Sequence, residues 1–181
     1  MNSRPRTIVK AKKEDLSDLF RFFALLEGET TPSEEELLTE IDRGGFYLLK
    51  SGTKIQGVAS ISHDVIEVFF PDSHSYRKSD DLLERIGYRG EPLCVLTRFA
   101  ISPLFRRKGL GSEFLQSLLA RYKGSTWLTE IRQNTLHAIP FFQKNNFSIL
   151  GIYPPIEGRE NESIIVYKTY KKDGLCSASW W

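Results

Sequence analysis

The sequence is poor in the features that mark secreted, fibrous and membrane proteins. Its 181 residues include two cysteines, Cys94 and Cys176, which lie far apart with no paired spacing. This excludes a disulfide framework and the spacing of a zinc site. No apolar run approaches the ~18 residues that span a bilayer, and the first residues lack the apolar segment of a signal peptide. We therefore expect a cytoplasmic protein with no bound metal and no membrane attachment.

Charge of one sign is also scarce, since 25 Lys and Arg face 23 Asp and Glu, for a net charge of +2. This near balance argues against a dedicated nucleic-acid binder. The local exception is FRRKGLGSEF, residues 105–114, where three consecutive cations precede two glycines. Adjacent like charges repel, so the arrangement is easiest to explain if an anion binds among them.

Hydrophobic periodicity predicts the elements of the first 62 residues. They are a strand at 7–10, an amphipathic helix at 14–29, a second helix at 31–45 and a hairpin at 46–62 that turns at Ser51-Gly52. For the second helix we predict a capping box with Thr31 as N-cap, Pro32 at the first helical position and Glu34 reaching back.

The pattern weakens over residues 63–91, which contain a strand-like apolar piece, a polar loop and a helical turn at 80–86. Bulky residues on both sides of 93–101 predict a central strand covered on both faces. The remaining predicted elements are a helix at 112–124, a strand at 125–131, a short helix at 134–146 with Pro140 in its first turn, and strands at 147–154 and 163–170. This order predicts an α/β protein, with a mixed sheet and helices on its faces.

The cationic stretch links the central strand to the start of a helix. The first N–H groups of a helix lack intrahelical partners and the helix dipole is positive there, which suits an anion. Gly109 and Gly111 let a ligand approach the backbone, so a pyrophosphate fits. A Walker A loop is excluded because the lysine precedes the first glycine, and a dinucleotide fingerprint because Phe114 stands at its third glycine.

Arg106-x-x-Gly109-x-Gly111 between a strand and a helix resembles the pyrophosphate loop of the GNAT superfamily, the acyl-CoA-dependent N-acyltransferases. The resemblance extends over residues 93–151. It implies a GNAT fold: a central, mixed, mostly antiparallel twisted sheet of about seven strands, with helices on both faces and a splay between the fourth and fifth strands. We expect one such domain over residues 1–170, followed by a mobile tail at 171–181.

The resemblance also implies a function: direct transfer of an acetyl or other short acyl group from acyl-CoA to a primary amine, in a ternary complex and without a metal. The acceptor would be a small molecule or a peptide, and the protein a monomer or a homodimer. The backbone of β-strand residues 99–101 would bind the pantetheine arm, and residues 106–112 the pyrophosphate. The residues expected to contact CoA are Phe99, Ala100, Ile101, Arg106, Arg107, Lys108, Gly109, Leu110, Gly111, Ser112, Asn134, Thr135 and Phe142.

The sequence departs from the family pattern where proton transfer is concerned. Val95 stands at the usual place of a glutamate base, and Phe142 at that of a tyrosine acid. The remaining catalytic candidates are Glu91, as a base, and Thr97. An alternative is therefore a degenerate domain that binds acyl-CoA as a sensor or partner module. Nucleic-acid binding through the basic turn ranks last, because the sequence offers one compact cluster.

Other polar residues have both a functional and an ordinary interpretation. Asn146 replaces a family glycine, and asparagine tolerates the left-handed conformation. Arg98 needs a carboxylate or a ligand anion, and we expect Glu130 to pair with Arg98 or Arg132. The further candidates are His63, Asp64 and Glu67 after the third strand, together with His74, His137 and the terminal Trp180-Trp181.

Overall fold

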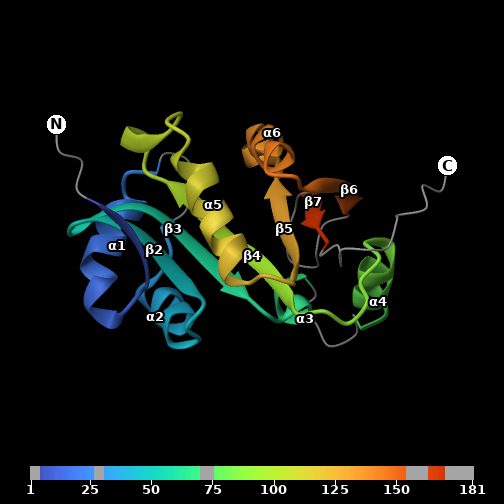
Figure 1. Ribbon diagram of the computed structural model, residues 1–181. Helices are drawn as coiled ribbons and strands as arrows, with labels where there is room; N and C mark the ends of the chain where they lie inside the picture. The colour runs from blue at the N-terminus through green and yellow to red at the C-terminus, as the bar shows by residue number, and fades with distance from the viewer. Residues whose placement is uncertain (1–4, 27–30, 70–75, 154–162, 170–181) are drawn as a thin grey trace. The chain divides into compact units, whose positions relative to one another are not determined.

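The computed structural model describes residues 5–26, 31–69, 76–153 and 163–169 (Figure 1). The chain divides into two compact units. The first unit comprises Met1–Ser62 and Leu96–Arg121, and the second His63–Val95 and Tyr122–Trp181. Strand β4 (Leu93–Ile101) contributes residues to both units.

The strands form a seven-stranded sheet in the order β1-β2-β3-β4-β5-β7-β6. The other strands are β1 (Arg6–Lys10), β2 (Phe46–Ser51), β3 (Lys54–Ser62), β5 (Thr126–Arg132), β6 (Ser148–Tyr153) and β7 (Ser163–Lys168). The pairs β1–β2, β2–β3, β5–β7 and β6–β7 are antiparallel within a mixed sheet. The predicted α/β class, the strand count and the order of the elements are confirmed.

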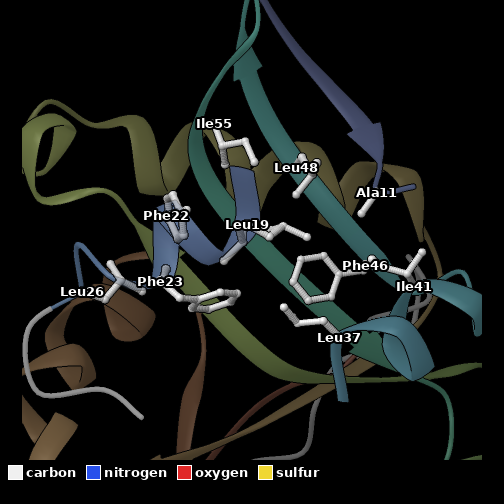
Figure 2. Packing of buried hydrophobic residues seen from close by; sticks show 12 residues of the cluster. Ala11, Leu19, Phe22, Phe23, Leu26, Leu37, Ile41, Phe46, Leu48 and Ile55 are labelled. Atoms are coloured by element: carbon white, nitrogen blue, oxygen red, sulfur yellow. The ribbon is translucent and has the colours of Figure 1, made fainter. Parts of the chain in front are cut away.

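The core of the first unit forms where helices α1 (Leu16–Phe23) and α2 (Glu34–Asp42) pack on β2 and β3. Figure 2 shows the apolar side chains of both helices meeting those of the strands. The members contributed by the helices recur at the spacings of three and four that place residues on one helix face: Leu19, Phe22, Phe23, Leu37 and Ile41. Burying a large apolar side chain of this kind stabilises the fold by about 1.5–3 kcal/mol.

Helices cover both faces of β4 within the first unit. Ala100 belongs to the core cluster under α1 and α2. Its neighbour Phe99 stacks on Phe114 of helix α5 (Leu110–Arg121), with ring centroids 5.5 Å apart. Successive residues of a strand point to opposite faces, so α5 covers the face opposite to α1 and α2. This confirms the prediction of a central strand covered on both faces.

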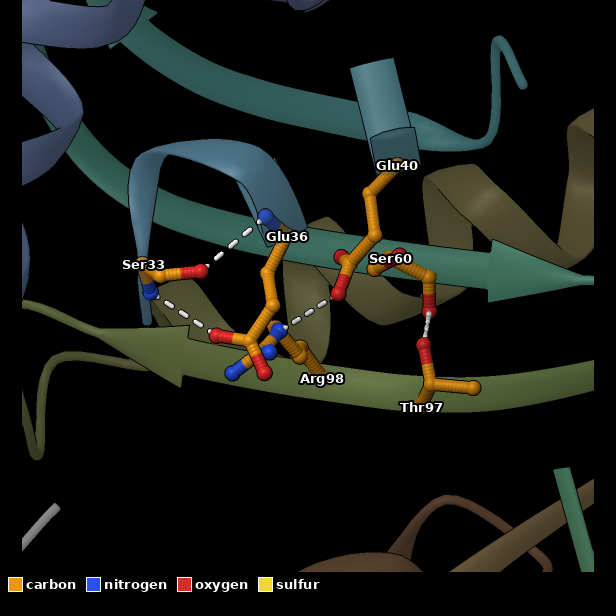
Figure 3. Close-up of polar contacts among 6 residues, drawn as sticks. All are labelled: Ser33, Glu36, Glu40, Ser60, Thr97 and Arg98. Carbon is orange, nitrogen blue, oxygen red and sulfur yellow. Dashed lines mark hydrogen bonds and ion pairs between the residues drawn. The ribbon is translucent and has the colours of Figure 1, made fainter. Parts of the chain in front are cut away.

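The N-cap of α2 is Ser33, so the prediction of Thr31 was wrong. The Ser33 hydroxyl accepts from the Glu36 N–H at 3.2 Å, and the Glu36 carboxylate accepts from the Ser33 N–H at 2.8 Å (Figure 3). Thr31 with Glu34 and Ser33 with Glu36 both fit the capping pattern, two residues apart. The later register leaves Pro32 before the cap, where it is buried.

The second unit has its own core, built by helices α3 (Val65–Phe69) and α4 (Tyr76–Arg85) on β5 and β7. The strand-like piece predicted near residue 65 is therefore a helix. Val65 and Phe69 are four residues apart and both buried in the same cluster, which is helical spacing. The helical turn predicted at 80–86 is confirmed as part of α4, whose Leu82 is fully buried.

In the second unit, a 3-10 helix, η3 (Gln133–Ala138), and helix α6 (Ile139–Lys144) connect β5 to β6. Pro140 lies in the first turn of α6, as predicted. Two further 3-10 turns, η1 (Lys13–Asp15) and η2 (Pro103–Phe105), belong to the first unit. Within the described ranges, none of the helices has the length and apolar character needed to cross a bilayer.

The α2 cap gives a direct test of the helix start. We expect Ser33→Ala to lower the free energy of unfolding by about 1 kcal/mol, because it removes one half of the capping box. The matched control, Thr31→Ala, is expected to change it by less than about 0.5 kcal/mol. Urea denaturation of both variants checks this, and a larger loss in Thr31→Ala would contradict the Ser33 cap.

Candidate functional site

The C-terminal half of β4 carries the residues predicted to bind the pantetheine arm. Phe99 packs on α5, while Ala100 and Ile101 are buried. These side chains pack against other parts of the first unit. A ligand that lies along this stretch would therefore meet mainly main-chain groups, and binding of the pantetheine arm here stays a prediction.

Thr97, a catalytic candidate, uses its hydroxyl within the first unit. The hydroxyl donates to the main-chain carbonyl of Ser60 on β3, at 3.2 Å (Figure 3). Its proton is therefore engaged in a bond between strands. A catalytic role for Thr97 stays a prediction.

The loop between β4 and α5 folds back on itself through two of its cations. The Arg106 Nε donates to the carbonyl of Ile101, the last residue of β4, at 3.0 Å. The Lys108 Nζ donates to the carbonyl of Leu104 at 3.3 Å. One bond reaches the end of β4 and the other reaches η2. The side chains thereby fix the loop on the strand.

Two residues of this loop have a left-handed backbone. Gly109 has a φ of 79° and Arg107 a φ of 60°. Glycine adopts this conformation without steric cost, but a residue with a Cβ atom loses about 1 kcal/mol. Strain of this kind gathers at functional sites, so Arg107 is a conformational feature that the sequence did not reveal.

Helix α5 begins directly after Gly109, whose carbonyl accepts the first helical bond from the Glu113 N–H at 3.1 Å. The predicted contacts Leu110, Gly111 and Ser112 form its first turn, where helix geometry offers main-chain N–H donors and a positive dipole end. A Cβ atom built on Gly109 would meet nothing within 4 Å. The space beside the turn is thus open to a ligand.

The charge of the loop is not balanced by the first unit. Arg106, Arg107 and Lys108 are exposed, and among the described residues none of them makes an ion pair with a carboxylate. Open backbone, a positive helix dipole and three unbalanced cations together suit an anion. We call residues 106–112 the anion-binding turn, after this predicted role.

In the second unit, the base candidate Glu91 lies two residues before β4. Its carboxylate accepts hydrogen bonds from the Thr126 hydroxyl and, at 3.0 Å, from the Arg89 N–H. Partial burial raises the pKa of Glu91, but these bonds and the charge of Arg89 outweigh it, so the pKa lies below its ordinary value. A carboxylate held in this way is a weaker base, because it binds a proton less readily. Its catalytic role also stays a prediction.

Cys94 and His63 lie together in the second unit. The His63 Nδ1–H donates to the Leu93 carbonyl at 2.7 Å, and the Cys94 Sγ is 3.9 Å from the same nitrogen. Burial raises the pKa of the Cys94 thiol to about 11, despite an opposing hydrogen bond with Ser125. The thiol is therefore neutral at physiological pH and is not an activated nucleophile.

The CoA contacts predicted in the second unit follow β5. Asn134 is exposed in η3, and the Thr135 hydroxyl donates to the Arg132 carbonyl at 3.0 Å. Phe142 is buried in α6 between Phe141 and Phe147. The position of the family tyrosine thus holds an aromatic core residue without a proton to give.

Asn146 has a φ of 65°, so it adopts the left-handed conformation that asparagine tolerates. The Val95 side chain, at the position of the family glutamate, is fully buried. Neither of the two positions that handle protons in the family pattern therefore carries an ionisable group.

Arg98 finds its carboxylate on α2. Its Nε lies 2.9 Å from a carboxylate oxygen of Glu40 (Figure 3), a partner that sequence spacing did not indicate. Glu130 lies 3.8 Å from Arg132, so that part of the predicted pairing is confirmed. The other oxygen of Glu40 is buried without a hydrogen-bond partner.

The structure assigns no role to the other candidates. Asp64 and His137 are exposed. The side chain of Glu67, His74 and the segment 171–181 lie outside the described residues.

The first turn of α5, with open space at Gly109 and cations that lack carboxylate partners, suits an anionic ligand. A family model described as the acetyltransferase (GNAT) family matches residues 13–147. The chain belongs to this family.

Solved structures share the fold. The ribosomal-protein-S18-alanine N-acetyltransferase from Escherichia coli is 17% identical, with a TM-score of 0.65 over 98% of this chain and 100% of that chain. The loading GNATL domain of CurA from Lyngbya majuscula is 17% identical, with a TM-score of 0.66 over 92% and 98%. Naa50 from Arabidopsis thaliana, in complex with the bisubstrate analogue CoA-Ac-MVNAL, is 14% identical, with a TM-score of 0.60 over 91% and 99%. A search of curated proteins finds no match.

The state of Glu91 predicts a pH effect on stability. A lowered pKa means that folding favours the charged carboxylate, so its contribution is present above the ordinary value of 4.5 and is lost as pH falls through the lower folded value. We expect Glu91→Gln to be less stable than wild type by about 1–2 kcal/mol at pH 7, and by less at pH 3. The control Glu84→Gln removes an exposed carboxylate and should change little. A difference that grows on acidification, measured by urea denaturation, would contradict this assignment.

The left-handed Arg107 predicts a difference between two neutral amides. Arg107→Asn should be more stable than Arg107→Gln by about 0.5–1 kcal/mol, because asparagine tolerates this conformation better. Both variants remove the same charge, so the comparison isolates the backbone. Equal free energies of unfolding would show that residue 107 is not left-handed in solution.

Proposed function

We propose that this protein is an N-acyltransferase that moves an acetyl or other short acyl group from acyl-CoA to a primary amine. The observation that carries the proposal is the open, left-handed turn at Gly109, which precedes α5 and is flanked by cations without carboxylate partners. Membership of the acetyltransferase family supports it, as does the CoA-derived ligand of the similar Naa50 structure.

The turn suits the pyrophosphate of CoA on chemical grounds. Main-chain N–H groups at a helix start bind phosphate oxygens, and the open space at Gly109 admits them close to the backbone. In this proposal residues 106–112 bind the pyrophosphate, and Phe99, Ala100 and Ile101 bind the pantetheine arm through main-chain groups. The acyl-CoA supplies an activated thioester carbonyl.

The chain's own contribution to transfer is then positioning and polarisation. A main-chain N–H of β4 would donate to the carbonyl oxygen, where negative charge develops as the amine attacks. Holding donor and acceptor together supplies on the order of 7–11 kcal/mol in favourable cases. The amine nitrogen would form the new C–N bond, and the C–S bond would break to release CoA as a thiolate. Val95 and Phe142 carry no ionisable group, so water would take up the amine proton and supply the proton that the thiolate gains.

The same two residues support a second candidate, an acyl-CoA-binding sensor without turnover. An assay of free CoA thiol released from acetyl-CoA separates the two candidates. The acceptors to be tested are a polyamine, an aminoglycoside, a free peptide N-terminus and a lysine peptide. The acyltransferase releases free thiol with at least one class of amine. A sensor binds acetyl-CoA and releases none.

The anion-binding turn is tested by Gly109→Val. We expect it to weaken acetyl-CoA binding at least about tenfold, or ~1.4 kcal/mol, because the side chain fills the open space beside the backbone. The control is Gly124→Val, which follows the other end of α5 and has a φ of 91° with equally open surroundings. Both variants should lose similar stability, about 1–2 kcal/mol, from the left-handed backbone. Calorimetric titration that finds equal affinity in the two variants would place CoA elsewhere.

A further inference from the structure

Two lysines that are distant in the sequence lie over one aromatic ring beside the anion-binding turn. Lys54 begins β3, and its Nζ is 5.4 Å from the centroid of the Phe105 ring. The Nζ of Lys108, in the loop itself, is 5.9 Å from the same centroid. Phe105 is the last residue of η2. Its ring thus contacts one ammonium group from the start of β3 and one from the loop before α5.

Within the described ranges, neither Lys54 nor Lys108 makes an ion pair with a carboxylate. By contrast, the partly buried Lys50 on β2 pairs with Asp15. Cation–π contacts hold the two lysines at a defined place but leave their charge unbalanced. A flexible ammonium group is a suitable contact for a phosphate, which it meets as a point charge.

Coenzyme A carries phosphate at two places, the pyrophosphate and the 3′-phosphate of its ribose. The turn at Gly109 accounts for the pyrophosphate, and Lys108 directly precedes that glycine. The two lysines therefore lie beside the turn that would hold the pyrophosphate. Their positive charge suits the negatively charged 3′-phosphate.

We propose that Lys54 and Lys108, ordered by the ring of Phe105, bind the ribose 3′-phosphate of CoA, so that Lys108 serves this phosphate while the rest of residues 106–112 serve the pyrophosphate. This inference rests on the proposed acyl-CoA function and adds a donor contact from outside the loop. It explains why a hairpin residue lies over the loop, and it makes affinity depend on a phosphate that is remote from the thioester.

The test is a calorimetric titration of CoA and of 3′-dephospho-CoA into three proteins: wild type, Lys54→Gln and Lys123→Gln. Lys123 is an exposed lysine that follows α5, so its variant removes the same charge at another place. We expect wild type to bind CoA about fivefold more tightly than dephospho-CoA, the upper range for an exposed charge pair. The preference should disappear in Lys54→Gln, through weaker binding of CoA alone, and persist in Lys123→Gln.

The outcomes separate the two proposals. If wild type binds both ligands equally, or if Lys54→Gln keeps the preference, the 3′-phosphate site is wrong while the proposed function stands. If both lysine variants lose the preference alike, the effect is one of net charge and the site is again overturned. If wild type binds neither ligand, the proposed function fails and this inference fails with it. Lys108→Gln provides a second variant, in which the preference should also disappear.

Discussion

The junction between β4 and α5 is the constraint on which the rest of the structure depends. A strand covered on both faces has to end in a turn that satisfies its last carbonyls and still leaves the first N–H groups of a helix open. The Arg106 side chain satisfies the last carbonyl of β4, because its Nε donates to Ile101. Residues 107 and 109 have a left-handed backbone and lie where the chain enters α5. The start of the helix stays uncovered beside Gly109. The proposed anion site is thus a consequence of how the strand ends.

Binding by main-chain groups also explains the pattern of side chains. Phe99, Ala100 and Ile101 can serve packing because their backbone, in the proposed mechanism, does the recognition. The absence of an ionisable group at Val95 and Phe142 is compatible with the same principle, because positioning and carbonyl polarisation need no particular side chain. Selectivity among acceptors would then depend on residues outside this junction.

Local sequence predicted the junction well, because strand, glycines and helix start are all short-range features. The same local rules failed where one stretch of sequence fits two local structures. Thr31 and Ser33 both fit a capping box, and the structure has the cap at Ser33. Val65 and Phe69 fit a strand or a helix, and burial in one cluster decides for the helix. Partners brought together by the fold, such as Glu40 for Arg98 and Lys54 for Phe105, have no signal in a single sequence.

Hydrogen exchange of the main-chain amides, followed by mass spectrometry with and without acetyl-CoA, tests the central claim most directly. The account places the ligand against the backbone of β4 and the start of α5. It therefore predicts slower exchange in peptides that cover residues 99–101 and 107–112, with little change in α1 and α2. Binding without protection of these peptides would contradict the account.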